Sequence, residues 1–412
     1  MKYYFKKAIT AFVLAGAMLF NSLPAFAASS STSVAENMQY LNSYFQIGSI
    51  SDTVTVEEFC SLLKKISNTE LTYSTDYTGM VQLLQPILQA SGMEELALTF
   101  PEEKYSKILS QYNVKLSLDD TTAKYAACAL STGIIQANDL TSTSISRAQA
   151  LRVLSAVADA TGQGRNFLGY SNDADIYGKL NNMWNSFEIF SDEVLDEIGS
   201  QAVQNKITTG YNLKKESYDA RFIPELTLRY GHDDIKHANQ IIGLLQSEGI
   251  VAKVQLEPKI SIYEYLLDWG PVPEPEPRYE VRQFSDDLYL VYAVEYDLAL
   301  EFNSTADKSK FDALILKYAK KSGENADAEG LLYGSWWQPL YTSTTPMTGN
   351  YRKIIDNVIT NGEYSIHPFC LDTDATTVKQ QLNALNSSVS VTQKALWCDE
   401  PFYRYLSGND YQ

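Results

Sequence analysis

The period of the hydrophobic pattern changes near residue 220, and this change limits the chain to folds built from two different units. Before it, apolar residues recur at helical spacing, as at Val56, Phe59, Cys60 and Leu63. After Phe222, apolar and polar residues alternate, which is typical of half-buried strands. We therefore expect an all-helical N-terminal unit followed by a unit that contains a β-sheet.

The C-terminal pattern alternates strands with helices. Strand patterns occupy residues 226–230, 250–257, 288–302, 331–341, 364–371 and 389–397, and helix patterns occupy 233–249, 304–322 and 378–385. The order β-α-β followed by β-α-β predicts a ferredoxin-like α/β sandwich, with helices on one face of an antiparallel sheet. The fold class expected for the whole chain is α+β.

Residues 1–27 have the form of a secretory signal peptide. Three lysines precede an apolar run, and Ala25-Phe26-Ala27 is a small-residue cleavage site. The run of about 13 apolar residues is too short to span a bilayer, which takes about 20, and no later run is long enough. The remaining boundaries are predicted at 28–165 for the helical domain, 166–220 for a helical connector and 221–412 for the α+β domain.

The charge balance excludes some partners. The chain has 33 Lys and Arg against 50 Asp and Glu, a net charge of −17. Phosphate backbones and anionic lipids repel such a chain, so we expect no nucleic-acid partner.

Four cysteines divide evenly between the two halves. An even number in an exported protein favours disulfides, and we predict the pairs Cys60 with Cys128 and Cys370 with Cys398 because each closes within one domain. The alternative is four buried free thiols.

Two helix starts in the N-terminal unit share one pattern. Thr55-Val56-Glu57-Glu58 and Ser146-Arg147-Ala148-Gln149 both have the form of a capping box, in which the first and fourth residues satisfy each other's backbone N–H groups. Each is followed by an apolar stripe. This recurrence indicates an internal repeat.

The second helix start, within residues 119–162, resembles a repeat of the S-layer homology family. Ile145-Ser146-Arg147-Ala148-Gln149 is similar to that family's Ile-Thr-Arg-Ala-Glu-like signature. The resemblance implies a helical module that holds an exported bacterial protein on a secondary wall polymer, a cell-wall polysaccharide, with Arg147 as the polymer-binding residue. A guanidinium fork suits the acidic groups of such a polymer.

This sequence departs from the family pattern in its other copies. The upstream copy has Val56 where the arginine belongs, and no clear third copy is present. The alternative is an all-helical domain in which the capping boxes are only caps and Arg147 is a solvated residue of the first turn.

Several residue pairs in the C-terminal half could carry chemistry. His232 and His237 are five positions apart rather than the four that suit a helical zinc pair, so we expect no metal and no cofactor. Glu295 and Asp297 alternate on one strand face, with Cα atoms about 6.6 Å apart. That separation falls within the range used in glycoside hydrolysis, although the wet side of a sheet is the plainer interpretation.

Two further sets of residues could carry out catalysis or bind a sugar. His367 and Cys370 could form a nucleophilic Cys–His pair, which requires a free thiolate. Five aromatic residues could stack on a sugar or pack in a core. They are Trp269, Tyr333, Trp336, Trp337 and Tyr341.

These patterns predict an exported bacterial cell-surface protein that is not an enzyme. An S-layer-homology-like module would associate it non-covalently with the cell wall, and the C-terminal domain would bind or display something. Two alternatives stay open: a secreted enzyme that acts on wall glycan or peptide, and a soluble secreted protein without wall binding.

Overall fold

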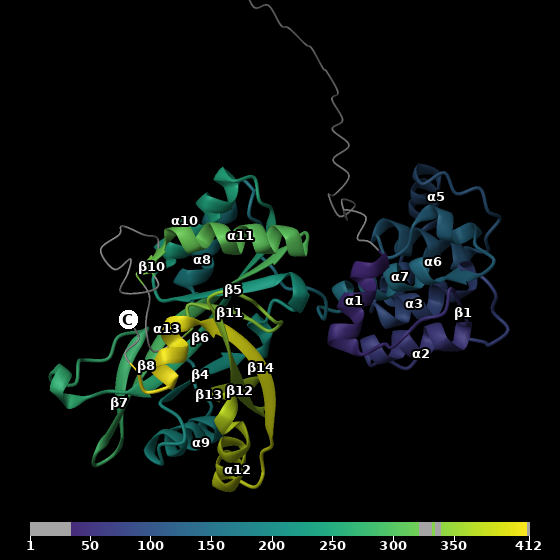
Figure 1. The fold of residues 1–412 in the computed structure, drawn as a ribbon. Helices are drawn as coiled ribbons and strands as arrows, with labels where there is room; N and C mark the ends of the chain where they lie inside the picture. Colours follow the sequence, from purple (N-terminus) through teal and green to yellow (C-terminus); the bar gives the residue numbers. More distant parts are fainter. Residues whose placement is uncertain (1–33, 321–331, 334–338, 410–412) are drawn as a thin grey trace, which may run out of the picture.

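The computed structural model describes residues 34–320, 332–333 and 339–409. The expected signal peptide, residues 1–27, lies outside the described residues. A helical unit and a larger unit built on a β-sheet lie side by side (Figure 1). Within the described residues, no helix combines the length and the apolar character needed to span a membrane.

Seven helices and one short two-stranded ladder build the N-terminal unit. They are α1 (Val34–Phe45), β1 (Thr53–Val54), α2 (Val56–Ser67), α3 (Leu84–Ala90), α4 (Glu94–Leu98), α5 (Glu102–Gln111), α6 (Asp120–Ser131), β2 (Ile145–Ser146) and α7 (Arg147–Ala160). The apolar stripe of α2 is buried together with Leu151 and Leu154 of α7 in one core cluster. The all-helical N-terminal prediction therefore agrees with the observed elements.

The two expected helix starts lie next to each other. The Thr55 hydroxyl accepts a hydrogen bond from the Glu58 N–H, and Ser146 and Gln149 form a complete capping box. Strand β1 pairs antiparallel with β2, which sets Val54 opposite Ile145. The two similar segments are far apart in the sequence, but they lie side by side in the fold, where β1 and β2 form a two-stranded ladder.

Residues 166–220, expected to be a helical connector, contain two helices and two strands of the large sheet. They are β3 (Gly169–Tyr170), α8 (Ile176–Asn185), α9 (Glu193–Gln204) and β4 (Gly210–Lys215). The apolar residues of α8 and α9 belong to the core of the larger unit.

The remaining elements continue the larger unit. They are β5 (Thr227–His232), α10 (Ile235–Ser247), β6 (Ala252–Glu264), β7 (Tyr279–Ser285), β8 (Leu288–Phe302), α11 (Thr305–Tyr318), β9 (Ala319–Lys320), β10 (Leu332–Tyr333), β11 (Tyr341–Ser343), β12 (Tyr351–Asn361), β13 (Tyr364–Leu371), α12 (Ala375–Leu385), β14 (Val391–Asp399) and α13 (Glu400–Leu406).

Eight antiparallel strands close into a barrel. Their order is β6-β4-β13-β12-β14-β11-β5-β8, and β8 pairs with β6 to complete the circle. The prediction of a ferredoxin-like α/β sandwich is wrong. The expected strands β5, β6 and β8 are neighbours, but both edges of that group are paired, because β6 bonds to β4 and β5 bonds to β11. Of the fourth expected strand, 331–341, the structure describes only 332–333 and 339–341, and Tyr341 alone falls in β11.

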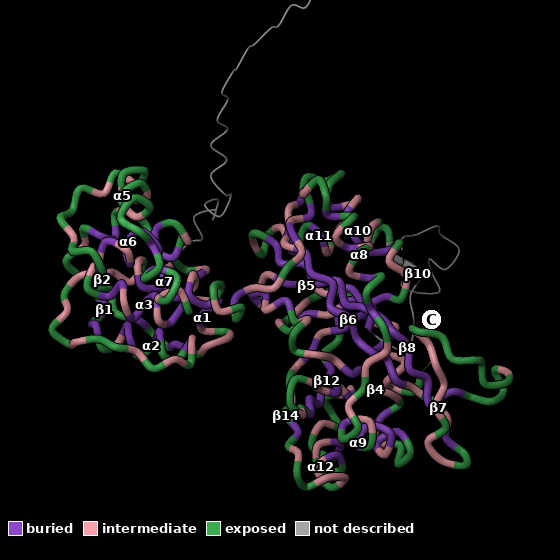
Figure 2. The backbone as a smooth tube through the Cα atoms, turned by 180° about the vertical axis from the view of Figure 1, so that it is seen from behind, coloured by how far each residue is buried: buried purple, intermediate pink, exposed green. Residues whose placement is uncertain are grey.

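Closure separates an apolar outside from a polar inside. On β8, the even-numbered residues from Leu290 to Phe302 pack in the main core with Ile241 and Ile242 of α10. Helices α8, α10 and α11 cover one side of the barrel, and α9 and α12 lie on the opposite side (Figure 1). The odd-numbered residues Glu257, Lys259 and Asp297 of β6 and β8 line the lumen, and β5, β6 and β8 are buried along most of their length (Figure 2).

Helix α13 closes one end of the barrel. Its Phe402 is buried in a small apolar cluster with Ile354, Leu396 and Cys398, which point inward from β12 and β14. The Phe402 ring also meets the edge of Phe369 of β13 at a centroid distance of 5.6 Å. An apolar cluster therefore fills this end of the lumen.

The four cysteines are buried free thiols, so neither predicted disulfide is formed. Strand β12 lies between β13 and β14 and separates Cys370 from Cys398 by two strand spacings, about 9–10 Å. A disulfide needs Cα atoms within about 7 Å. In the helical unit, α3 packs against both α2 and α6, which carry Cys60 and Cys128.

Candidate functional site in the barrel lumen

The barrel encloses a cavity of about 330 Å³ that is lined by residues from all eight of its strands. Most of the lining side chains are polar or charged. They include Lys214, Arg229, Glu257, Lys259, Asp297 and Asp356. The rim at the end opposite α13 includes the exposed turn between β12 and β13, at Gly362 and Glu363.

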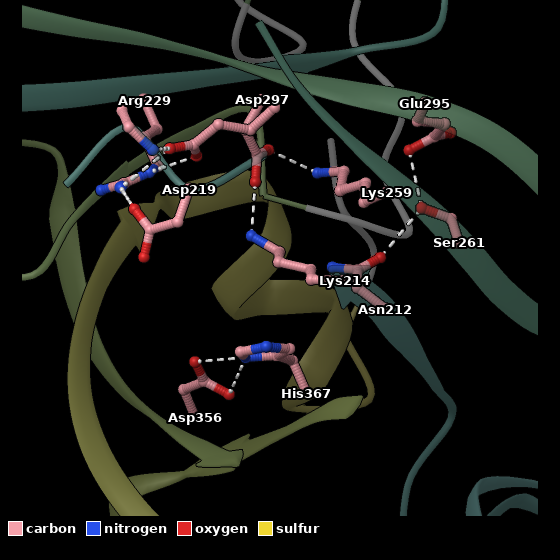
Figure 3. Close-up of polar contacts among 12 residues, drawn as sticks. Asn212, Lys214, Asp219, Arg229, Lys259, Ser261, Glu295, Asp297, Asp356 and His367 are labelled. Atoms are coloured by element: carbon pink, nitrogen blue, oxygen red, sulfur yellow. Dashed lines mark hydrogen bonds and ion pairs between the residues drawn. The ribbon is translucent and has the colours of Figure 1, made fainter. Parts of the chain in front are cut away.

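Asp297 lies at the centre of the charged residues (Figure 3). Its Oδ1 accepts a hydrogen bond from Lys259 Nζ and its Oδ2 accepts one from Lys214 Nζ, each at 2.6 Å. Burial raises the pKa of Asp297, but the two ammonium groups outweigh burial and hold that pKa well below its usual range. Asp297 is therefore ionised and shared by two cations.

Glu295, two residues earlier on β8, has the opposite environment. Its side chain is only 1% exposed, and its Oε2 lies 2.8 Å from the hydroxyl of Ser261, which also contacts Asn212 (Figure 3). Burial raises the pKa of Glu295 to about 8, although Lys259 opposes the shift. The carboxyl is thus mostly protonated at neutral pH, and Asp297 is the carboxylate that both Lys214 and Lys259 contact.

Arg229 lies between two carboxylates. Its guanidinium donates two hydrogen bonds to Glu257, at 2.8 and 3.2 Å, from β5 to β6. Glu257 also accepts a hydrogen bond from the Ala220 N–H. Asp219, which also lines the cavity, pairs with Arg229 at 3.7 Å, so one guanidinium faces two carboxylates on this side of the lumen.

A second polar group lies on the β12–β13 side. His367 Nδ1 is 2.9 Å from Asp356 Oδ2, and His367 Nε2 is 2.9 Å from Ser365 Oγ. All three residues line the cavity. Ser365 and His367 are two positions apart on a predicted strand and therefore share a face, but nothing in the sequence pattern links them to Asp356.

His367 and Cys370, weighed as a possible Cys–His pair, are not in contact. Cys370 is three positions from His367 on β13, so the two side chains point to opposite faces of the strand. Cys370 belongs to the core outside the barrel, where the Asn357 amide donates to its sulfur, and burial raises its thiol pKa.

The structure brings His232 and His237 together without completing a metal site. Their ring centroids are 4.0 Å apart, and His232 Nδ1 accepts hydrogen bonds from the N–H groups of Asp233 and Asp234. In the part of the chain that the structure describes, no group of three or more His, Cys, Asp or Glu residues could hold a metal ion.

Of the aromatic residues that could stack on a sugar, the two whose side chains the structure describes lie in different environments. Trp269 is half exposed and meets the edge of Tyr265 on the loop after β6, whereas Tyr341 is buried in the main core. Trp336, Trp337 and the Tyr333 side chain lie outside the described residues.

Arg147 begins α7 directly after β2, and its side chain contacts the segment just before β1. Its Nε donates to the Ile50 carbonyl and its Nη2 pairs with Asp52, both at 2.8 Å, while 39% of the side chain stays exposed. A hollow of about 880 Å³ in the helical unit begins at the next two residues of the signature, Ala148 and Gln149, and includes Arg152.

Comparisons with protein-family models, with curated proteins and with solved structures find no match for this chain. Membership of the S-layer homology family therefore stays a prediction.

Proposed function

We propose that the chain is an exported bacterial cell-surface protein whose barrel binds a small anionic ligand in its lumen and whose helical unit associates with the cell wall. The observation that carries the ligand proposal is the convergence of two lysine side chains, Lys214 and Lys259, at the wall of one cavity. Two ammonium groups share one carboxylate there, and the neighbouring Glu295 carboxyl is mostly protonated at neutral pH.

Two ammonium groups at the wall of one cavity favour a ligand that carries negative charge, because charges interact more strongly in a closed lumen than in water. A carboxylate or phosphate group would accept hydrogen bonds from Lys214 and Lys259. The cavity of about 330 Å³ is at the small end of ligand sites, so the ligand is a small molecule.

Isothermal titration calorimetry with small carboxylates, inorganic phosphate and a neutral sugar as reference tests this proposal. We expect an anion to bind the chain lacking residues 1–27, and Lys214→Gln to weaken binding about tenfold or more, since about 1.4 kcal/mol corresponds to tenfold. Lys353→Gln is the matched control, because the Lys353 side chain is on the outer face of β12 and pairs with Asp372. An affinity equal in Lys214→Gln and wild type contradicts the lumen as the site.

Wall association rests on different residues. The paired helix starts at β1 and β2 and the hollow beside Gln149 give the helical unit a groove next to the signature segment. Arg147 keeps part of its guanidinium accessible despite its pairing with Asp52.

Co-sedimentation of the chain with bacterial sacculi, with and without their secondary wall polymer, tests the wall proposal. We expect binding only to polymer-bearing sacculi, and release by Arg147→Ala but not by Lys107→Ala, an exposed lysine of α5 in the same unit. If the wild-type chain stays in solution, the protein is a secreted protein without wall binding.

A further inference from the structure

Ser365, His367 and Asp356 form a continuous chain of hydrogen bonds inside the lumen. Ser365 Oγ lies 2.9 Å from His367 Nε2, and His367 Nδ1 lies 2.9 and 3.1 Å from the two oxygens of Asp356. The side chains of His367 and Asp356 are 13% and 14% exposed, and all three residues line the cavity. The serine end of this chain is therefore next to space that a ligand can enter.

The barrel holds this arrangement on strands rather than on loops. Ser365 and His367 are alternate residues of β13, which is paired on one side with β4 and on the other with β12, the strand of Asp356. Sites supported by paired strands keep their geometry better than sites on loops.

The Asp356 carboxylate also determines which nitrogen of the His367 ring carries the proton. A carboxylate accepts only from an N–H, so Nδ1 carries the proton, and in the neutral ring Nε2 is left as an acceptor toward the serine hydroxyl. A nucleophile, a base and a group that orients the base are thus present in the order that acyl transfer requires.

We propose that Ser365 is the nucleophile of an acyl hydrolase, with His367 as general base and Asp356 as its positioning residue, acting on a small carboxylic ester that carries a negative charge. The inference rests on the proposed anion-binding lumen, because the same cavity supplies both the positive charge and the triad. Lys214 lies directly across from Ser365 in the pairing of β4 with β13 and places positive charge beside the nucleophile.

The reaction balances as an ester hydrolysis. Ser365 Oγ attacks the ester carbonyl carbon as its proton moves to His367 Nε2, and the intermediate then expels the alcohol oxygen, which takes that proton. Water attacks the acyl-serine while Nε2 accepts a proton from it, and the acid leaves as the proton returns to Ser365. The net change is ester plus water to acid plus alcohol, and no other reactant is needed.

The test uses the chain lacking residues 1–27, a fluorophosphonate probe that phosphonylates activated serines, and intact-mass and peptide-mapping readouts. We expect one label per chain, at Ser365, and none in Ser365→Ala. His367→Gln and Asp356→Asn should slow labelling about 100-fold or more, the lower range for general base catalysis. Ser388→Ala, at an exposed turn, is the matched control and should label like wild type.

Anion binding by calorimetry, measured on the same samples, separates the two proposals. Labelling at Ser365 that depends on His367 supports the hydrolase inference. A chain that binds an anion but is not labelled, or whose Ser365 label is insensitive to both His367→Gln and Asp356→Asn, overturns the hydrolase inference and leaves the ligand proposal standing. A chain that neither binds an anion nor is labelled overturns both.

Discussion

Glu295 and Asp297 lie on the same face of β8, but their pKa values shift in opposite directions because the two carboxyl groups have different neighbours. Asp297 forms ion pairs with both Lys214 and Lys259. Glu295 has the Ser261 hydroxyl as its hydrogen-bond partner. The negative charges of Asp297 and Asp233 raise the pKa of Glu295 further. Such divergent pairs mark sites where one carboxyl stays neutral and the other charged.

Glutamine resembles the protonated form of Glu295. The Glu295→Gln variant should therefore be more stable than wild type, by a margin that grows as the pH rises. Folded Glu295 keeps its proton to about pH 8, while in the unfolded chain it ionises near 4.5. Its contribution to stability is therefore full below pH 4.5 and is lost as the pH rises to about 8. One pKa unit corresponds to about 1.4 kcal/mol, which is worth about 3–6 °C in unfolding midpoint for a domain of about 150–250 residues.

Thermal unfolding of Glu295→Gln and wild type at pH 5, 6.5 and 8 measures this effect. We expect midpoints that nearly coincide at pH 5 and differ by several degrees at pH 8, with the variant more stable. Glu363→Gln on the exposed β12–β13 turn is the control and should show no such trend. A Glu295→Gln midpoint difference that does not grow with pH contradicts the raised pKa.

Sequence alternation placed Glu295 and Asp297 on one face but could not give their roles. The residues that set their charge states come from β4 and β6, which are far from β8 in the sequence. The triad was missed for the same reason. Ser365 and His367 were visible as alternate residues, but Asp356 joins them only through the pairing of β12 with β13.

Helix α13, which closes one end of the barrel, is linked to the start of β11 through Asp399. The Asp399 carboxylate accepts from the Phe402 N–H at the start of α13 and also from the N–H groups of Leu340 and Tyr341. One side chain thus fixes the helix and the start of a barrel strand. Phe402 then fills the end of the lumen above Cys398.

Phe402→Ala should open this end of the barrel. Truncation of a buried phenylalanine costs about 3–5 kcal/mol, which urea denaturation would measure. We also expect Cys398, whose thiol is fully buried in the wild type, to react with a small thiol reagent while Cys370 stays protected.

Two variants serve as controls for the end-closure prediction. Phe402→Leu, which keeps most of the volume, should retain most of the protection. Cys398→Ala combined with Phe402→Ala should abolish the new reactivity. If the combined variant still reacts at the same rate, the exposed thiol is not Cys398 and α13 does not close the lumen as described.

Local patterns predicted the strands β5, β6, β8 and β13 and the helices between them, but not closure of the barrel. Closure depends on β4, within a segment expected to be a connector, and on β12, whose run of β-branched residues was not recognised. Pairing of distant strands leaves no local period in the sequence, so the polar face of β8 was taken for a solvated face.

At the scale of the whole molecule, the two units meet at Glu301 of β8. This carboxylate has no solvent exposure and contacts Arg165 and Lys253, while the Ile223 N–H donates to it at 2.6 Å. Arg165 also pairs with Glu36 of α1 at 3.3 Å. Ile223 is buried in the core of the helical unit, so the contact joins both cores.

Glu301→Gln should loosen the junction without unfolding either unit. It leaves Arg165 and Lys253 without their buried counter-charge, and breaking a buried ion pair costs about 3–5 kcal/mol. Because each unit keeps its own core, we expect two separate thermal transitions, faster proteolysis near residues 161–168, and a larger radius of gyration by small-angle X-ray scattering. Glu188→Gln, at an exposed position, should change none of these. A Glu301→Gln chain with one transition and wild-type dimensions would mean that apolar contacts around Ile223, rather than this charged contact, hold the units together.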